Sequence, residues 1–179
     1  MTRYALFLRG VNVGTKNALP MLKLRALLEK IGCHHVRTYV QSGNAVFSTA
    51  LATAALTKAV EHALERVMGR PIDTTLRTRK QMEAIVEANP FAQVATHPAY
   101  LCVTFLSHAQ PASTFAPLHA RDWMPEQFRV VGKEVYSWHP RGQGNSPLAA
   151  ALWKLPLRGT ITTRNWNTVQ KVTAMLAEG

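Results

Sequence analysis

The chain has 179 residues, of which 47% are hydrophobic and 17% are charged, which is a globular composition long enough for one domain or two small ones. No apolar run approaches the roughly 20 residues that span a membrane, and the N-terminus has neither the apolar stretch nor the cleavage site of a signal peptide. The two cysteines, Cys33 and Cys102, are isolated from each other, which predicts buried, reduced thiols in a cytoplasmic protein without a membrane partner.

The charge of the chain is strongly positive and unevenly distributed. Twenty-one Lys and Arg against ten Asp and Glu give a formal net charge of +11. No acid precedes Glu29 and none lies between Glu134 and Glu178, whereas residues 61–120 are balanced. The positive field therefore comes from the two end thirds. Such a field attracts nucleic acid, nucleotides, phosphorylated metabolites or anionic surfaces, although a basic protein can also use its charge for solubility alone.

The first half of the chain predicts a β-α-β-β-α-β-α order. Apolar residues at helical spacing follow Pro20, which suits the first turn of a helix, and Gly43 lies in a hairpin signal at residues 41–44. Asn89-Pro90 ends the last helix of this half. The predicted strands are residues 4–8, 36–40, 45–48 and 72–76, and the predicted helices are residues 20–31, 56–67 and 79–88.

The second half can be read in the same order. Residues 111–124 contain two prolines and predict one or two short helical turns, and Gly132-Lys133 predicts a hairpin turn. The predicted strands are residues 101–106, 128–131, 134–138 and 160–163, and the predicted helices are residues 146–153 and 165–177. The sequence thus predicts an α+β protein made of two ferredoxin-like units, each a four-stranded antiparallel sheet with helices packed on it. The predicted domains are 1–89 and 99–179, with a junction at 90–98.

This topology determines which loops meet. In a β-α-β-β-α-β sheet the first two strands run one way and the last two run the other. The loop at residues 9–17 and the turn at residues 41–44 should therefore lie at one end of the first sheet. The segments 141–146 and 162–167 should likewise share an end of the second sheet.

Three polar segments occur in order along the chain. They read RGVNVGTKN at residues 9–17, RTYVQSGN at residues 37–44 and TRNWNT at residues 163–168. With these motifs the chain resembles, over nearly its whole length, a bacterial family catalogued only as domain of unknown function 1697. The resemblance implies no established activity. Members carry a second glycine where this chain has Thr15, and a Ser-Lys pair where it has Ser146-Pro147.

The first polar loop is a candidate anion site. It is not a phosphate-binding P-loop, because no Gly-Lys-Ser/Thr ending follows its glycines. Glycines still allow backbone N–H groups to approach an anion, and a helix N-terminus follows. The asparagines either contact a ligand or fix the loop through local hydrogen bonds. The ligand candidates in this loop are Arg9, Gly10, Asn12, Gly14, Lys16 and Asn17.

Other polar segments supply further ligand candidates, each with a structural alternative. Gln41, Ser42, Gly43 and Asn44 form a hairpin turn that completes the site only if the fold places it beside the first loop. Arg164 offers a bidentate fork for phosphate or carboxylate, whereas Asn165 is also a candidate helix cap and Trp166 has the spacing of a core residue. The glycine-rich segment with Arg141 and Ser146 is either an anion pocket or a flexible connection.

These segments contain few of the residues that catalytic sites typically use. No carboxylate lies in any of the loops, which removes general-base and magnesium schemes based on Asp or Glu. The seven histidines are scattered without metal-ligand spacing, and Ser42 and Ser146 lack an adjacent base in the sequence. The sequence therefore predicts no metal and no cofactor, and it identifies no catalytic residue.

Three hypotheses follow. The leading one is a cytoplasmic binding protein for an anionic ligand, a nucleotide or nucleic acid, contacted first by Arg9, Asn12, Lys16, Asn44 and Arg164. The alternative is an enzyme that acts on a phosphorylated or carboxylated small molecule through electrostatic stabilisation by Arg and backbone amides. In the third, the loops are purely structural. The sequence leaves the oligomeric state open.

Overall fold

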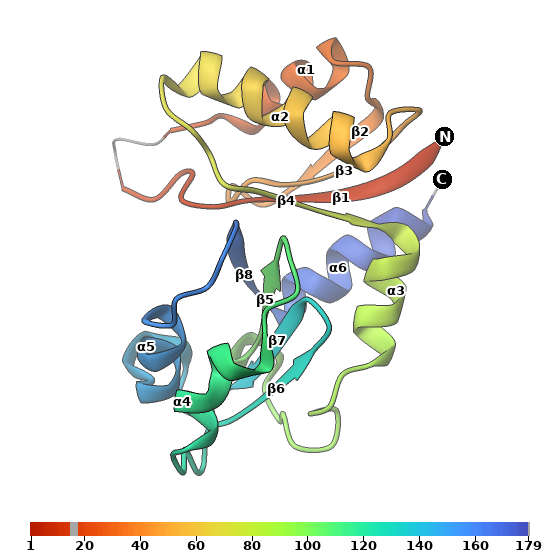
Figure 1. Ribbon diagram of the computed structural model, residues 1–179. Coiled ribbons are helices and arrows are strands. Elements are labelled where there is room, and N and C mark those ends of the chain that lie inside the picture. Colours follow the sequence, from red (N-terminus) through yellow and green to blue (C-terminus); the bar gives the residue numbers. More distant parts are fainter. Residues whose placement is uncertain (15–17, 179) are drawn as a thin grey trace. The chain divides into compact units, whose positions relative to one another are not determined.

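The computed structural model describes residues 1–14 and 18–178 of the chain (Figure 1). Its internal contacts define two compact units, one formed by Met1–Val86 with Gln170–Gly179 and the other by Glu87–Val169. The sequence assigned residues 99–179 to a single domain, whereas the residues from Gln170 onward group with the first unit. They do so because Arg3 and Arg37 donate hydrogen bonds to backbone carbonyl oxygens near the C-terminus of the last helix.

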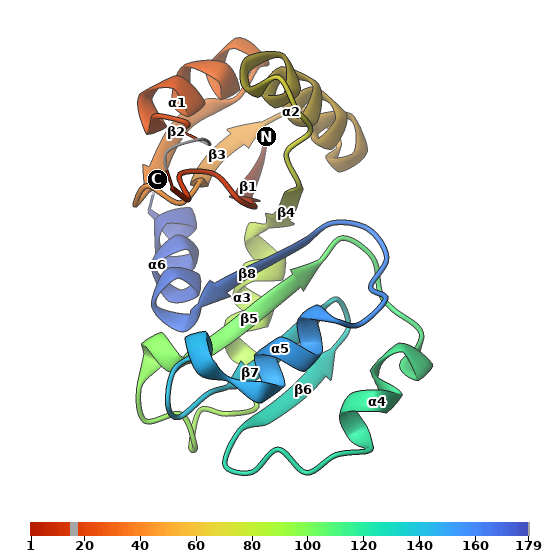
Figure 2. The same cartoon turned by 90° about the vertical axis from the view of Figure 1, so that its left-hand side faces the viewer.

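The first unit is a four-stranded antiparallel sheet with the strand order β2-β3-β1-β4. Helices α1 and α2 lie side by side on one face of it (Figures 1 and 2). Alternate residues of β1, namely Tyr4, Leu6 and Leu8, pack into a core with the buried faces of both helices. The elements are β1 (Thr2–Leu8), α1 (Met21–Lys30), β2 (His34–Tyr39), β3 (Asn44–Thr49), α2 (Thr53–Met68), β4 (Thr74–Thr78) and α3 (Arg79–Glu87).

The second unit repeats this order of strands as β6-β7-β5-β8. Its smaller core joins Leu106 and Val135 of the sheet to Leu148 and Leu152 of α5. The elements are η1 (Pro98–Tyr100), β5 (Leu101–Leu106), η2 (Ala112–Phe115), α4 (Ala116–His119), β6 (Gln127–Val131), β7 (Glu134–Trp138), η3 (Gln143–Asn145), α5 (Pro147–Trp153), β8 (Ile161–Asn165) and α6 (Trp166–Ala177), which continues into the first unit. The predicted α+β class with two ferredoxin-like units is confirmed.

Several strand ends differ from the prediction by one or two residues, and three of these differences have a clear structural basis. β2 ends at Tyr39, because Val40 has a φ of 50° and leaves the extended conformation. β4 begins at Thr74, which pairs with Leu8, and not at the apolar Ile72, which packs in the core. β8 runs as far as Asn165, so Arg164 lies within a strand and not after it.

Both cysteines are buried, as predicted, and neither forms a disulfide in the structure. Burial raises the pKa of the Cys33 thiol to about 11 and that of Cys102 to about 12. The thiols are therefore protonated near neutral pH and are poor nucleophiles. Among the described residues, no helix is both long and apolar enough to cross a membrane.

Candidate functional site

The first polar loop and the β2–β3 turn meet at one end of the first sheet. The backbone N–H of Leu8 donates to the carbonyl of Gly43 at 3.0 Å, and the Asn12 side chain donates to the carbonyl of Gln41. Lys16 and Asn17, two of the predicted ligand residues in this loop, lie outside the described residues, as does Thr15. The juxtaposition that the topology required is present in the part of the chain that the structure describes.

Asn12 anchors the described part of this loop. Its Nδ2 donates to the carbonyl of Leu19 at 2.9 Å in addition to that of Gln41, and its Oδ1 accepts from the Leu19 N–H at 2.7 Å. Its φ of 55° is one that asparagine tolerates better than most residues. The Asn12 side-chain amide thus forms its hydrogen bonds with the protein's own backbone. Of the two roles that the sequence left open for Asn12, the geometry favours fixing the loop.

The β2–β3 turn is fixed from inside as well. A Cβ on Gly43 would lie 2.7 Å from Val11 Cγ2 and 2.8 Å from Leu8 Cβ, so only glycine fits beneath the first loop. Asn44 is completely buried, and its Nδ2 donates to the carbonyl of Tyr39 at 3.1 Å and to Ser42 Oγ at 2.9 Å. Gly43 and Asn44 therefore shape the turn and present no group to a ligand.

Cations and exposed backbone remain at the surface of this end. The Arg9 side chain is 47% exposed, and its NH1 lies 3.4 Å from Asp73 Oδ2. Arg70, which lies outside the three polar segments, donates from NH2 to the carbonyl of Gly10 at 3.3 Å. We call this surface the basic loop end; it consists of the exposed or partly exposed residues Arg9, Gly10, Gly14, Gln41, Ser42 and Arg70.

The candidates in the second unit serve mainly as structural groups. Asn165 Oδ1 accepts from the Thr168 N–H at 3.0 Å and so caps α6. Arg164 NH1 donates to the carbonyl of Thr163 at 2.9 Å, and burial lowers the pKa of Arg164 to about 10. A desolvated guanidinium within a strand is less accessible to a ligand than the sequence suggested. Trp166 is buried, which agrees with its predicted core role, and Arg141 is exposed.

Ser146 belongs to a buried polar network that sequence spacing did not reveal. His139 is completely buried; its Nδ1 lies 2.8 Å from Ser146 Oγ and 3.1 Å from Glu126 Oε1, and its Nε2 lies 2.9 Å from Ser137 Oγ. Ser146 has no base adjacent to it in the sequence, but the fold brings His139 beside it. The hairpin of β6 and β7 reverses the direction of the chain, so that Glu126 and Ser146, twenty residues apart in sequence, both contact His139.

The geometry of this network is structural and does not fit a nucleophilic triad. A triad needs the serine on one ring nitrogen and the acid on the other, whereas here both share Nδ1. Ser146 Oγ also accepts from the Ala149 N–H at 2.8 Å, and Glu126 Oε2 accepts from the Leu148 N–H at 3.0 Å. The serine and the carboxylate together satisfy N–H groups at the start of α5.

The protonation of the network follows from burial and hydrogen bonding. Burial lowers the pKa of His139, although Glu126 opposes this, so the imidazole is neutral near pH 7. Burial by itself raises the pKa of Glu126, but hydrogen bonds from Ser146, Leu148 and His139 outweigh it and leave the pKa lowered. An ionised Glu126 accepting from a neutral His139 fits these directions.

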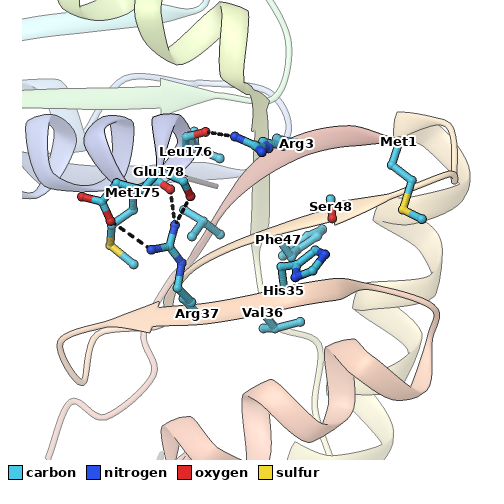
Figure 3. A pocket seen from close by; sticks show the side chains of 11 residues that line it. Met1, Arg3, His35, Val36, Arg37, Phe47, Ser48, Met175, Leu176 and Glu178 are labelled. Atoms are coloured by element: carbon cyan, nitrogen blue, oxygen red, sulfur yellow. Dashed lines mark hydrogen bonds and ion pairs between the residues drawn. The ribbon is translucent and has the colours of Figure 1, made fainter.

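A separate pocket of about 770 Å³ lies beside β1, β2 and β3 and the C-terminal end of α6 (Figure 3). Its two arginines point towards that helix end. Arg3 NH1 donates to the carbonyl of Leu176 at 2.9 Å, and Arg37 binds the carbonyls of Met175 and Glu178 and the Glu178 carboxylate. Cations at a helix C-terminus satisfy its free carbonyls and its dipole. The pocket's arginines therefore already bind the protein's own groups.

A family model described as "Protein of unknown function (DUF1697)" matches residues 1–136. The chain belongs to this family. The match includes the basic loop end and the β2–β3 turn, whereas the third polar segment, residues 163–168, lies beyond it. No group of three potential metal ligands occurs among the described residues of this DUF1697 protein.

A solved structure is similar over nearly the whole chain. It is described as "The structure of conserved bacterial protein SP0830 from Streptococcus pneumoniae", has a TM-score of 0.81 and 26% sequence identity, and covers 98% of each chain. No curated protein matches the DUF1697 chain. The comparisons support the family and the fold, and they name no ligand or reaction.

Proposed function

We propose that this cytoplasmic DUF1697 protein binds an anionic ligand, a nucleotide or nucleic acid, at the basic loop end. The observation that carries the proposal is that some residues at this end anchor the loops internally while others stay exposed. Asn12, Gly43 and Asn44 hold the two loops from inside, while the Arg9 guanidinium is left about half exposed beside the Gly10 backbone. A loop fixed before binding loses little entropy when it receives a ligand.

The charges at this end support an anion. Arg9 and Arg70 reach the same stretch of backbone around Gly10, and no acid precedes Glu29 in the sequence. The acid in contact is Asp73, and its ion pair with Arg9 is long and exposed. Exposed pairs of this kind contribute about 0–1 kcal/mol, so a phosphate can replace the aspartate at little cost.

The test is fluorescence anisotropy with labelled single- and double-stranded oligonucleotides at low and near-physiological salt. Binding through phosphates gives an affinity that falls linearly with salt in a log–log plot. Arg9→Gln/Arg70→Gln should lower that slope by about 2, since each phosphate contact contributes about 1. The matched control Arg25→Gln/Lys80→Gln removes the same charge from exposed helical positions and should change the slope much less.

The other hypotheses give different results. Absence of oligonucleotide binding at low salt contradicts a nucleic-acid ligand, and thermal stabilisation by nucleotides or phosphorylated metabolites is then measured with the same variants. Turnover of a stabilising compound supports the enzyme hypothesis. A loss of several kcal/mol of stability in Arg9→Gln/Arg70→Gln, without any ligand effect, supports the purely structural hypothesis.

A further inference from the structure

A second surface of the first unit carries a different chemistry. A groove of about 820 Å³ runs between α1 and α2. Its floor is entirely aliphatic, and Ile31 and Ala63 of the floor also pack against the core of the unit. The groove is thus supported from below and does not depend on a mobile loop. The floor consists of Ala26, Leu27, Ile31, Ala59, Ala63 and Val67.

Both edges of this groove are basic. Lys23 and Lys30 lie two helical turns apart on α1, and Lys58, His62 and Arg66 follow one another at four-residue spacing on α2. None of these five side chains forms a hydrogen bond or an ion pair with another described residue. Two rows of cations therefore flank an apolar trough without internal partners for their charge.

On these two helices, most basic residues line the groove and all acidic residues lie outside it. The helices carry five Lys or Arg, and four of these line the groove, Arg25 being the exception. Their three acids, Glu29, Glu61 and Glu65, do not line the groove. A surface that exists only to keep a protein soluble has no need of this separation. A solvent-exposed apolar hollow with a polar rim is instead typical of a binding site.

We propose that this groove binds an acidic amphipathic helix of a partner protein. In this recognition mode an apolar stripe lies in a hydrophobic groove, and residues flanking the stripe meet the groove's edges. Acidic residues on both flanks complement the rows of Lys23 and Lys30 on one side and Lys58 and Arg66 on the other. The small side chains of Ala26, Ala59 and Ala63 leave room for the backbone of such a helix to approach.

The floor argues against two other anionic partners. It has no aromatic ring on which a base could stack, which disfavours single-stranded nucleic acid. It is also a hollow lined by small side chains, whereas interfacial helices insert projecting aromatic and leucine side chains into a bilayer. The site is distinct from the basic loop end, because none of its lining residues belongs to that surface.

The experiment uses the full chain and a labelled synthetic helix. The peptide has about 16 residues, the length of α2, with leucine and alanine on one stripe and glutamate on both flanks. Two control peptides have the same composition in scrambled order, or lysine in place of glutamate. Fluorescence anisotropy should show binding of the first peptide only. Labelled single-stranded DNA and vesicles of phosphatidylserine and phosphatidylcholine are measured alongside it.

The variants separate the groove from general electrostatics. Lys30→Glu/Arg66→Glu should weaken peptide binding about tenfold, whereas Arg25→Glu/Lys80→Glu, with the same change in net charge, should have little effect. Ala26→Trp fills the groove without changing charge and should also weaken binding, whereas Ala54→Trp at an exposed α2 position outside the groove should not. These substitutions are at exposed positions, so the fold is expected to survive.

Several outcomes overturn the proposal. Equal weakening by both charge-reversed variants means non-specific attraction, and no binding of the acidic helix means that the groove is not its site. Binding of DNA or of vesicles that is lost only in Lys30→Glu/Arg66→Glu assigns the groove to those partners instead. Arg9→Gln/Arg70→Gln should leave peptide binding unchanged, so this proposal and that for the basic loop end can fail separately.

Discussion

In the first unit the polar loops are held by the neutral amides of Asn12 and Asn44, whereas in the second unit the segment after β7 is held by His139 and Glu126, which titrate. Both arrangements satisfy backbone N–H or carbonyl groups that the sheet leaves open at its ends. They differ in what they leave at the surface. The amides leave the arginines of the basic loop end at least partly exposed, whereas the second network turns its ionisable groups inward. Local anchoring can therefore be achieved on one topology with or without a sensitivity to pH.

The largest change in the free energy of unfolding is expected at Gly43, where the first unit leaves no room for a side chain. Gly43→Ala places a Cβ against Val11 and Leu8 at a φ of 74°, and it should cost about 2–4 kcal/mol of the free energy of unfolding. Gly10→Ala is the matched control: its φ is 67°, but no heavy atom lies within 4 Å of the added Cβ, so the cost should be about 1 kcal/mol. Equal costs would mean that the conformation alone, and not the close contact, requires glycine at 43.

Urea unfolding can follow the two units separately. All four tryptophans lie between residues 123 and 166, within the second unit, so tryptophan fluorescence reports that unit and far-UV circular dichroism reports both. Gly43→Ala should shift the circular dichroism transition more than the fluorescence transition.

Removal of His139 tests the second unit's network. His139→Phe keeps the ring volume but leaves Glu126, Ser137 and Ser146 without a buried partner, and it should cost about 2–4 kcal/mol. His119→Phe makes the same change at an exposed position of this unit and should cost less than about 0.5 kcal/mol. Tryptophan fluorescence in urea measures both. A loss as small as that of the control would show that water replaces the missing imidazole.

The stability of the second unit should depend on pH through the His139–Glu126 pair. The folded pKa values of His139 and Glu126 lie below their ordinary values of 6.5 and 4.5, so in each titration range the unfolded chain binds more protons. The free energy of unfolding therefore decreases as pH falls, first below about 6.5 through His139 and then below about 4.5 through Glu126. The fluorescence midpoint in urea should follow this course. The His139→Phe variant should lose the first part of the decrease; retention of it would assign the proton to another histidine.

The fold could be predicted from sequence because its signals are local. A short, nearly continuous apolar run was sufficient to predict β5 at residues 101–106, and the polar turn at residues 41–44 predicted the hairpin of β2 and β3. Where local signals conflicted with tertiary pairing, the boundaries moved. Ile72 resembles the start of a strand, yet pairing begins at Thr74 opposite Leu8.

The candidate site was predicted less completely, because residue type does not show which way a side chain points. Asn12 and Asn44 have side chains that could contact a ligand, but they form hydrogen bonds with the protein's own backbone instead. Ser146 caps α5, and this role was not predicted, because the histidine and the glutamate that it contacts are distant in sequence. The groove between α1 and α2 was equally hidden, because its basic rows come from two helices.

The smallest effect concerns Val40, next to the basic loop end. Val40 is 52% exposed and has a φ of 50°, which a β-branched residue adopts at a cost of about 1 kcal/mol. Val40→Gly relieves that cost but also gives the unfolded chain more freedom, so the net change in the free energy of unfolding should be a stabilisation of less than about 1 kcal/mol. Thr38→Gly, within β2, lacks the strain and should destabilise. Urea unfolding followed by circular dichroism distinguishes the two signs.

The strained Val40 lies directly before Gln41 and Ser42 of the basic loop end. Strain retained in a turn is often coupled to function, because the surrounding structure holds the backbone in a conformation that it would otherwise leave. If Val40→Gly stabilises the protein and also weakens oligonucleotide or nucleotide binding, the strained turn holds Gln41 and Ser42 in their binding positions. If it stabilises the protein and leaves binding unchanged, the strain only completes the hairpin, and the ligand contacts of the basic loop end are confined to the first loop and Arg70.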